Sequence, residues 1–181
     1  MVLLRSNLAV ALQHDGRPGE ALAELDAVIA MSARVYGAQH SQTLIARFNR
    51  VEALNDSGQN QQALQEGQAL RADMVAAVGD GHPFTLETDD AIGFALTRLG
   101  RAAEAEALHR RTIAGKTATL GADNPYTLLS REYLGRALIA LRRFDEARTE
   151  LGKLLADRER VLGKDKHKTG VARELLDSIP R

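Results

Sequence analysis

Two stretches that align without a gap decide the fold: VGDGHPFTLETDDAIGFALTRLGRAAEA at residues 78–105 and LGADNPYTLLSREYLGRALIALRRFDEA at residues 120–147. They are offset by 42 residues, and the same offset runs through the rest of the sequence. It relates four series of residues: Ala21, Ala63, Ala105 and Ala147; Gly37, Gly79, Gly121 and Gly163; Thr43, Thr85, Thr127 and Thr169; and Leu12, Leu54, Leu96 and Leu138. A fixed period of this length indicates a repeat architecture, in which each unit packs on its neighbours.

Each period contains two helices with a short turn between them. Apolar residues recur three and four positions apart on both sides of a turn that is marked by Gly16 and its counterparts, with Arg142 in the fourth period. Between periods, a Gly follows one helix and a Pro begins the next, with His82 or Asn124 as the N-cap residue. The sequence predicts helices over residues 1–14, 18–35, 41–56, 60–77, 83–98, 102–119, 125–140, 144–161 and 168–179.

The repeated residues have distinct packing roles. The alanines allow the second helix of a repeat to approach the first closely, and the leucines fill the space between the two helices. Repeat two should pack least tightly, because Gly67 lies inside its second helix. Arg50 occupies a core position of the same repeat, where it must reach solvent or an acidic neighbour. We therefore expect an all-α solenoid of antiparallel helix pairs, in which each pair depends on its neighbours.

The composition excludes several classes of function. The 24 basic and 24 acidic residues cancel, so the formal net charge is zero and no overall field attracts nucleic acid or an anionic membrane. There is no Cys, which excludes disulfides and thiolate metal sites and fits a reducing cytoplasm. The longest apolar runs are too short to span a membrane. We expect a cytoplasmic protein that binds neither nucleic acid nor membrane directly.

The two quoted blocks resemble the kinesin light chain type of tetratricopeptide repeat (TPR), and the resemblance covers essentially the whole chain. It implies a right-handed α–α superhelical solenoid as a single domain over residues 1–181. The repeats would lie at about 1–40, 41–82, 83–124 and 125–166, followed by a capping helix at about 168–179 with Val171, Leu175 and Ile179 on one face. The Ala and Arg usage suggests a bacterial source, and a start in mid-repeat is expected of a fragment of a longer protein.

The resemblance also implies where a ligand binds. The first helices of successive repeats line a concave groove, which in such proteins holds extended peptides or partner helices. The groove residues that we single out are Phe48, Glu52, Asn55, Asp56, Glu87, Asp90, Phe94, Arg98 and Arg136. Further positions expected on this face are Ser6, Val10, Gln13, His14, Thr97, Glu132 and Ile139. The carboxylate-binding variety of the family is not supported, since Val10, Glu52 and Phe94 stand where that variety has Asn or a basic residue.

These groove residues predict a protein or peptide ligand with an apolar anchor and basic flanks. Phe48 and Phe94 are the anchors in a chain with only 4% aromatic residues, and ordinary packing between neighbouring first helices is an equal alternative. The acidic residues would make the middle of the groove negative, unless they form a solvated helix face. Arg98 and Arg136 could clamp a carboxylate, or could pair with Glu132 instead.

No motif predicts catalysis, a metal site or a cofactor. His40 and His82 stand one period apart, too far to share an ion, and we interpret them as N-caps. His109 takes a place that other repeats fill with Leu25 or Leu151, which favours a core role. The threonine series near the helix starts indicates structure rather than a nucleophile. The HExxH, GxxxxGK and GxSxG motifs are absent, so we expect no enzyme.

Two functions fit this pattern. The first is a scaffold that binds a peptide or helix in its groove, and the alternative is a regulatory or oligomerisation segment of a larger signalling or transcription-regulator protein. The first helix bears on the alternative because its apolar residues are too widely spread to be covered by one neighbour. These residues are Val2, Leu3, Leu4, Leu8 and Val10. We expect an upstream repeat to cover this strip, or a second copy of the chain through self-association.

Overall fold

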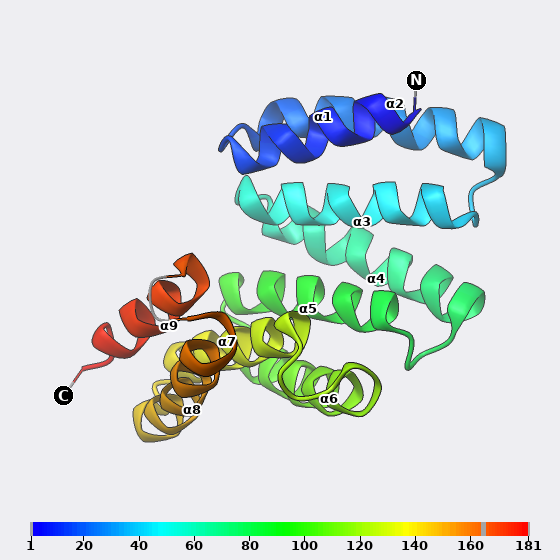
Figure 1. Ribbon diagram of the computed structural model, residues 1–181. Helices are drawn as coiled ribbons and strands as arrows, with labels where there is room; N and C mark the ends of the chain where they lie inside the picture. The colour runs from blue at the N-terminus through cyan, green and yellow to red at the C-terminus, as the bar shows by residue number, and fades with distance from the viewer. Residues whose placement is uncertain (1, 164–165, 181) are drawn as a thin grey trace. The chain divides into compact units, whose positions relative to one another are not determined.

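The computed structural model describes residues 2–163 and 166–180, which form nine α-helices and no strand (Figure 1). The helices are α1 (Val2–His14), α2 (Pro18–Tyr36), α3 (Ser41–Asp56), α4 (Asn60–Val78), α5 (Pro83–Arg98), α6 (Ala102–Leu120), α7 (Pro125–Ala140), α8 (Phe144–Leu162) and α9 (His167–Asp177). Each described helix end lies within about two residues of its predicted position, which confirms the all-α fold class. α9 stops at Asp177 because Ile179 precedes Pro180, whose ring disfavours a helical conformation in the residue before it.

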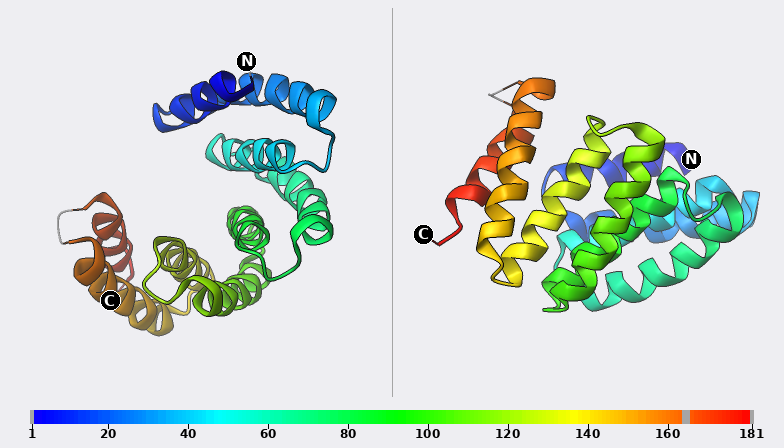
Figure 2. Two further views of the ribbon diagram at one scale, coloured as in Figure 1. Left: turned by 45° about the vertical axis from the view of Figure 1, so that its right-hand side comes forward. Right: turned by 90° about the horizontal axis from the view of Figure 1, so that it is seen from below.

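The chain divides into two compact units, one ending at Ala95 and the other beginning at Leu96. In the first unit α2 packs against α1 and α3, and α3 packs against α4; in the second unit α7 packs against α6 and α8, and α8 against α9. Short turns return α2 alongside α1 and α4 alongside α3 in unit 1, and α8 alongside α7 in unit 2 (Figure 2). A single solenoid over the whole chain stays a prediction. None of the described helices is long and apolar enough to cross a membrane.

Small residues lie where the two helices of a repeat pack together. The four repeated alanines are fully buried, and the repeated leucines lie in the core as predicted. In unit 1, Ala9 of α1 packs with Leu25 of α2. In unit 2, a Cβ atom added to Gly135 would lie 2.4 Å from Cδ2 of Leu151. α7 and α8 can therefore approach this closely only because position 135 carries no side chain.

Gly67 lies at a close contact between repeats two and three. Gly67 is buried, and a Cβ atom there would lie 2.9 Å from Cγ1 of Ile92 in α5. The missing side chain thus gives room to its neighbour and leaves no gap. Arg50 meets an acidic neighbour as expected, because its Nε donates to Oδ1 of Asp26 at 2.7 Å. The relative stability of repeat two stays a prediction.

The turns between repeats are held by a recurring hydrogen bond. Each threonine of the series donates its hydroxyl to the carbonyl of the glycine six residues before it, at 2.8–2.9 Å. These glycines have φ of 92–102°, a conformation that side chains disfavour. His40, His82 and Asn124 accept from backbone N–H groups two residues ahead, which confirms them as N-caps. The threonines are therefore structural, as predicted.

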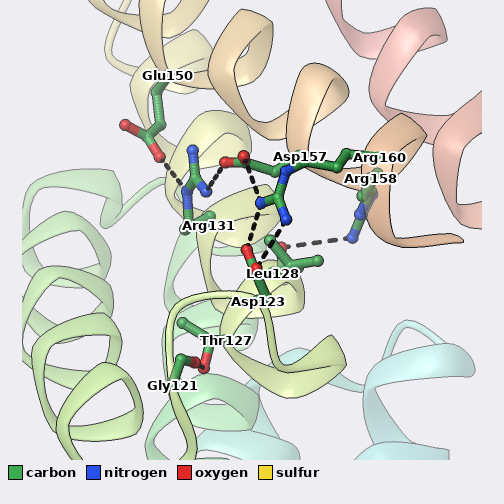
Figure 3. A network of polar contacts seen from close by, with 9 residues as sticks. All are labelled: Gly121, Asp123, Thr127, Leu128, Arg131, Glu150, Asp157, Arg158 and Arg160. Atoms are coloured by element: carbon green, nitrogen blue, oxygen red, sulfur yellow. Dashed lines mark hydrogen bonds and ion pairs between the residues drawn. The ribbon is translucent and has the colours of Figure 1, made fainter.

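An ion-pair network joins α7 and α8 to the loop before α7 (Figure 3). Arg131 donates from Nε to Glu150 at 2.8 Å and from Nη1 to Asp157 at 2.7 Å. Arg160 donates to Asp157 at 3.1 Å and to both oxygens of Asp123, at 2.8 and 2.5 Å. The hydrogen bond from Arg131 is the largest cause that lowers the pKa of Asp157, while partial burial opposes it. This network fixes two charged helices and a loop in one register.

Replacing Gly135 by Ala should destabilise unit 2 by about 2 kcal/mol, because the new methyl group overlaps Leu151. Gly152 is a matched control in α8, since a Cβ atom there meets nothing within 4 Å. Gly152→Ala should stabilise the protein by up to about 1 kcal/mol through helix propensity. Urea unfolding of both variants measures this difference, and a stabilising Gly135→Ala would contradict the close contact.

Asp157→Asn should lower the free energy of unfolding by about 1 kcal/mol at pH 7. Because the folded-state pKa of Asp157 is lowered, its contribution is present above the unfolded pKa of about 4 and is lost as the pH falls through the folded value. The difference from the wild type should therefore shrink below about pH 4. Urea midpoints measured from about pH 7 to about pH 2.5 test this.

The control is Asp145→Asn, because the Asp145 side chain is fully exposed beside Arg148 and should change little at any pH. A pH-independent loss for Asp157→Asn would show that its role is packing rather than charge.

Candidate functional site

The predicted groove positions of unit 1 lie on α1, α3 and α5 up to Ala95, which stack on one another in Figure 1. Two contacts tie the carboxyl-terminal halves of these helices together. The Nδ2 of Asn55 in α3 donates to the carbonyl of Ala91 in α5 at 3.0 Å. Asp56 accepts a hydrogen bond from Gln13 and lies near His14, both in α1. Of the predicted groove residues, only Gln13, His14 and Asp56 are thus shown to lie together, and the wider groove stays a prediction.

The two predicted anchors keep part of their surface accessible. Phe48 and Phe94 are both half-buried, on α3 and α5 respectively. A phenylalanine in the core is normally covered, as the repeated leucines of this chain are. Partial burial fits either alternative raised by the sequence, so the role of the two rings as groove anchors stays a prediction.

The predicted acidic and polar residues separate into a surface group and an interior group. Glu52 and Glu87 are half-buried and Asp56 is exposed, whereas Asn55 and Asp90 are buried. Asn55 and Asp90 therefore present almost no surface to a ligand, although both lie on the predicted helices. Protein atoms crowded around the Asp56 carboxyl raise its pKa, while the hydrogen bond from Gln13 and the nearby His14 lower it in part.

Sequence reasoning missed the buried carboxylate next to this group. Asp89 is fully buried and accepts from Nε of Arg71 at 2.5 Å, and Arg71 also contacts Asp80. A signal was present in the period, because Asp89 stands where other repeats have Arg47 or Arg131. A reversed charge at a repeated position indicates that its partner has changed as well.

In unit 2 the predicted basic residues have different surroundings. Arg136 donates from Nε and Nη2 to Oε1 of Glu132, at 3.0 and 2.8 Å, so the predicted alternative pairing with Glu132 is confirmed. Arg98 is exposed at the end of α5. The other oxygen of Glu132 accepts from Nη1 of Arg158 at 2.8 Å, and Arg158 is almost completely buried. Arg158 also reaches the carbonyl of Leu128, as Figure 3 shows.

No group of three or more metal-ligating side chains gathers in the part of the chain that the structure describes. His109 is fully buried and its ring lies against Tyr133, with ring centroids 5.7 Å apart, which confirms its predicted core place.

The helix pairs of the chain match a known protein family. The profile of the tetratricopeptide repeat family matches residues 1–72 and 84–160. The chain belongs to this family. TPR repeats are protein–protein interaction modules and are not built for catalysis, and the predicted TPR solenoid class is thereby confirmed. A comparison with curated proteins gave no match.

Two solved structures share the fold. Both are crystal structures of a Podosopora anserina protein described as a putative kinesin light chain with nearly identical TPR-like repeats. One, of a variant with a single substitution, is 24% identical with a TM-score of 0.77, covering 97% of this chain and 82% of that one. The second structure is also 24% identical, with a TM-score of 0.76 and coverages of 97% and 83%. The resemblance to kinesin light chain repeats is therefore confirmed at the level of the fold.

The TPR unit at the amino-terminal side also carries an exposed apolar strip. Leu3 and Leu4 of α1 are 68% and 70% exposed, and Leu8 is 47% exposed. The positions equivalent to Leu4 and Leu8 in repeat three hold Thr88 and Ile92, both buried. Ile92 on this face of α5 lies close to Gly67 of α4, the second helix of the preceding repeat. The predicted exposure of α1 is thus confirmed.

Proposed function

We propose that this TPR protein is a scaffold whose first helices in unit 1 bind an extended peptide or a helix of a partner protein. The main support is that Phe48 on α3 and Phe94 on α5 are both half-buried. A hydrogen bond from Asn55 to the Ala91 carbonyl holds these two helices together. Aromatic side chains contribute large contact area with few rotatable bonds, and they dominate the energy of many interfaces. The anchor of the ligand is therefore apolar.

Charge supports a ligand with basic flanks. Glu52, Glu87 and Asp56 all lie at the surface of the helices that carry the two phenylalanines, whereas the nearest predicted basic group in unit 1 is His14. A negative rim attracts cationic segments and repels acidic ones, which acts mainly on the association rate and on specificity. A cytoplasmic location is the setting that we propose for such a partner.

Replacing both Phe48 and Phe94 by Ala should weaken binding at least about 30-fold, since a central aromatic anchor contributes about 2 kcal/mol or more. The probe is a peptide selected on the wild-type protein from a displayed random library and measured by fluorescence anisotropy. Helical content by circular dichroism checks that the double variant remains folded.

The matched control is Tyr36→Ala, because Tyr36 is 49% exposed at the end of α2, a helix that carries none of the predicted groove positions. It should leave the affinity unchanged. Equal binding by wild type and the Phe48/Phe94 double variant would overturn the proposed groove.

A second candidate is an oligomerisation segment, favoured by the exposed strip on α1. We propose that α1 packs against α1 of a second copy, because Leu3, Leu4 and Leu8 form one apolar surface that is its own complement across a two-fold axis. Small exposed area makes this association weak and concentration-dependent.

Leu3→Gln with Leu4→Gln should abolish this association, which multi-angle light scattering measures over a range of protein concentrations. Val35→Gln is the control, since Val35 is 61% exposed on α2 and away from the strip. A wild-type protein that is monomeric at all concentrations, or a double variant that still associates, would rule out the α1 contact.

A further inference from the structure

An apolar pocket of about 190 Å³ opens in unit 1 at the junction between repeats two and three. It lies between the start of α3, the end of α4 and the start of α5, where the predicted groove residues play no part. Its apolar walls are Leu44, Ile45, Met74, Ala77, Val78 and Phe84. Leu44 and Met74 are buried at its floor, whereas Val78 and Phe84 are 44% and 41% exposed at its rim.

Two uncharged polar residues, Gln39 and Ser41, also line the pocket. The Nε2 of Gln39 donates to Oδ1 of Asp73 at 2.9 Å. The other oxygen of Asp73 accepts from Nη1 of Arg47 at 2.6 Å. This pair is electrically neutral, and the described residues that line the pocket include no charged side chain. The pocket therefore complements an uncharged apolar group rather than an ion.

A comparison of equivalent positions shows why the pocket is apolar in repeat two. Met74 stands where repeat four has Arg158. In that repeat the guanidinium of Arg158 donates to the carbonyl of Lys168 at 2.7 Å and to Glu132 at 2.8 Å, so polar groups occupy the place. Phe84 stands two periods before Lys168, which lies at the start of α9. The two substitutions replace a polar junction by an apolar one.

We propose that this pocket binds one aromatic side chain of a partner protein, at a site separate from the groove. The size fits, because an apolar cavity of about 150 Å³ accommodates benzene. The exposed rim of Val78 and Phe84 allows the side chain to enter from solvent. A protein anchored here and in the groove would be held by two separate contacts, which raises its apparent affinity.

The first test uses toluene, which carries the ring of a phenylalanine side chain, and the methyl NMR signals of labelled methionine. The Met74 signal should shift saturably with millimolar toluene, whereas Met31, which does not line the pocket, should stay unchanged. Ala77→Phe fills the pocket and should abolish the shift. Ala76→Phe adds the same ring to the neighbouring exposed residue outside the pocket and should retain it.

The second test asks whether a protein ligand uses the pocket. Peptides are selected from a displayed random library on the wild-type protein, with removal of those that also bind Ala77→Phe. The retained peptides should share an aromatic residue, and replacing that residue by Ala should weaken binding at least about tenfold. The Phe48/Phe94 double variant should still bind them, which separates this site from the groove.

Either of two NMR results would overturn the proposal: no saturable Met74 shift in the wild type, or an unchanged shift in Ala77→Phe. Retained peptides without a shared aromatic residue would equally exclude an aromatic anchor as the occupant.

Discussion

Close contact between helices, made possible by one small residue at the contact, is the interaction on which the structure depends. Leu25 packs on Ala9, and Leu151 lies so close to Gly135 that no Cβ atom fits. Burying a leucine side chain against a neighbouring backbone is worth about 2 kcal/mol, but only if the opposite side chain is absent or minimal. Gly67 applies the same rule between repeats, where it makes room for Ile92 of the next first helix. At each of these contacts, a small residue on one helix thus faces a large residue on the other.

Once the helices pack at this distance, the polar groups at the turns set the direction of the next repeat. The threonine-to-glycine hydrogen bond recurs at each described junction between repeats, where a buried hydroxyl satisfies a carbonyl that the helix end leaves free. Ion pairs also connect neighbouring helices: Arg50 joins α3 to Asp26 of α2 in unit 1, and Arg131 ties α7 to α8 in unit 2. These pairs fix the register of neighbouring helices, because each arginine meets its carboxylate at only one relative position of the two helices.

The surfaces proposed to bind partners are those that the packing between helices leaves exposed. The first helices of unit 1 keep Phe48 and Phe94 partly exposed beside acidic residues, and the junction of repeats two and three keeps an apolar pocket open. Both surfaces include positions at which the repeats differ in sequence. Phe94 in repeat three is equivalent to Glu52 in repeat two, and Met74 in repeat two is equivalent to Arg158 in repeat four. A repeat scaffold can change such positions with little cost to the fold, because each repeat contacts only its neighbours.

The sequence by itself determined the helices, their turns and the buried alanine and leucine series, because a period of 42 residues repeats the local signals four times. It also placed Phe48, Glu52 and Asp56 on one helix face, since helical geometry follows from spacing alone. Only the tertiary structure decided that Asn55 and Asp90 are buried. The burial of these two residues is set by the neighbouring helix and not by the helix that carries them. In the same way, only the structure showed that Ile92 of α5 lies close to Gly67 of α4.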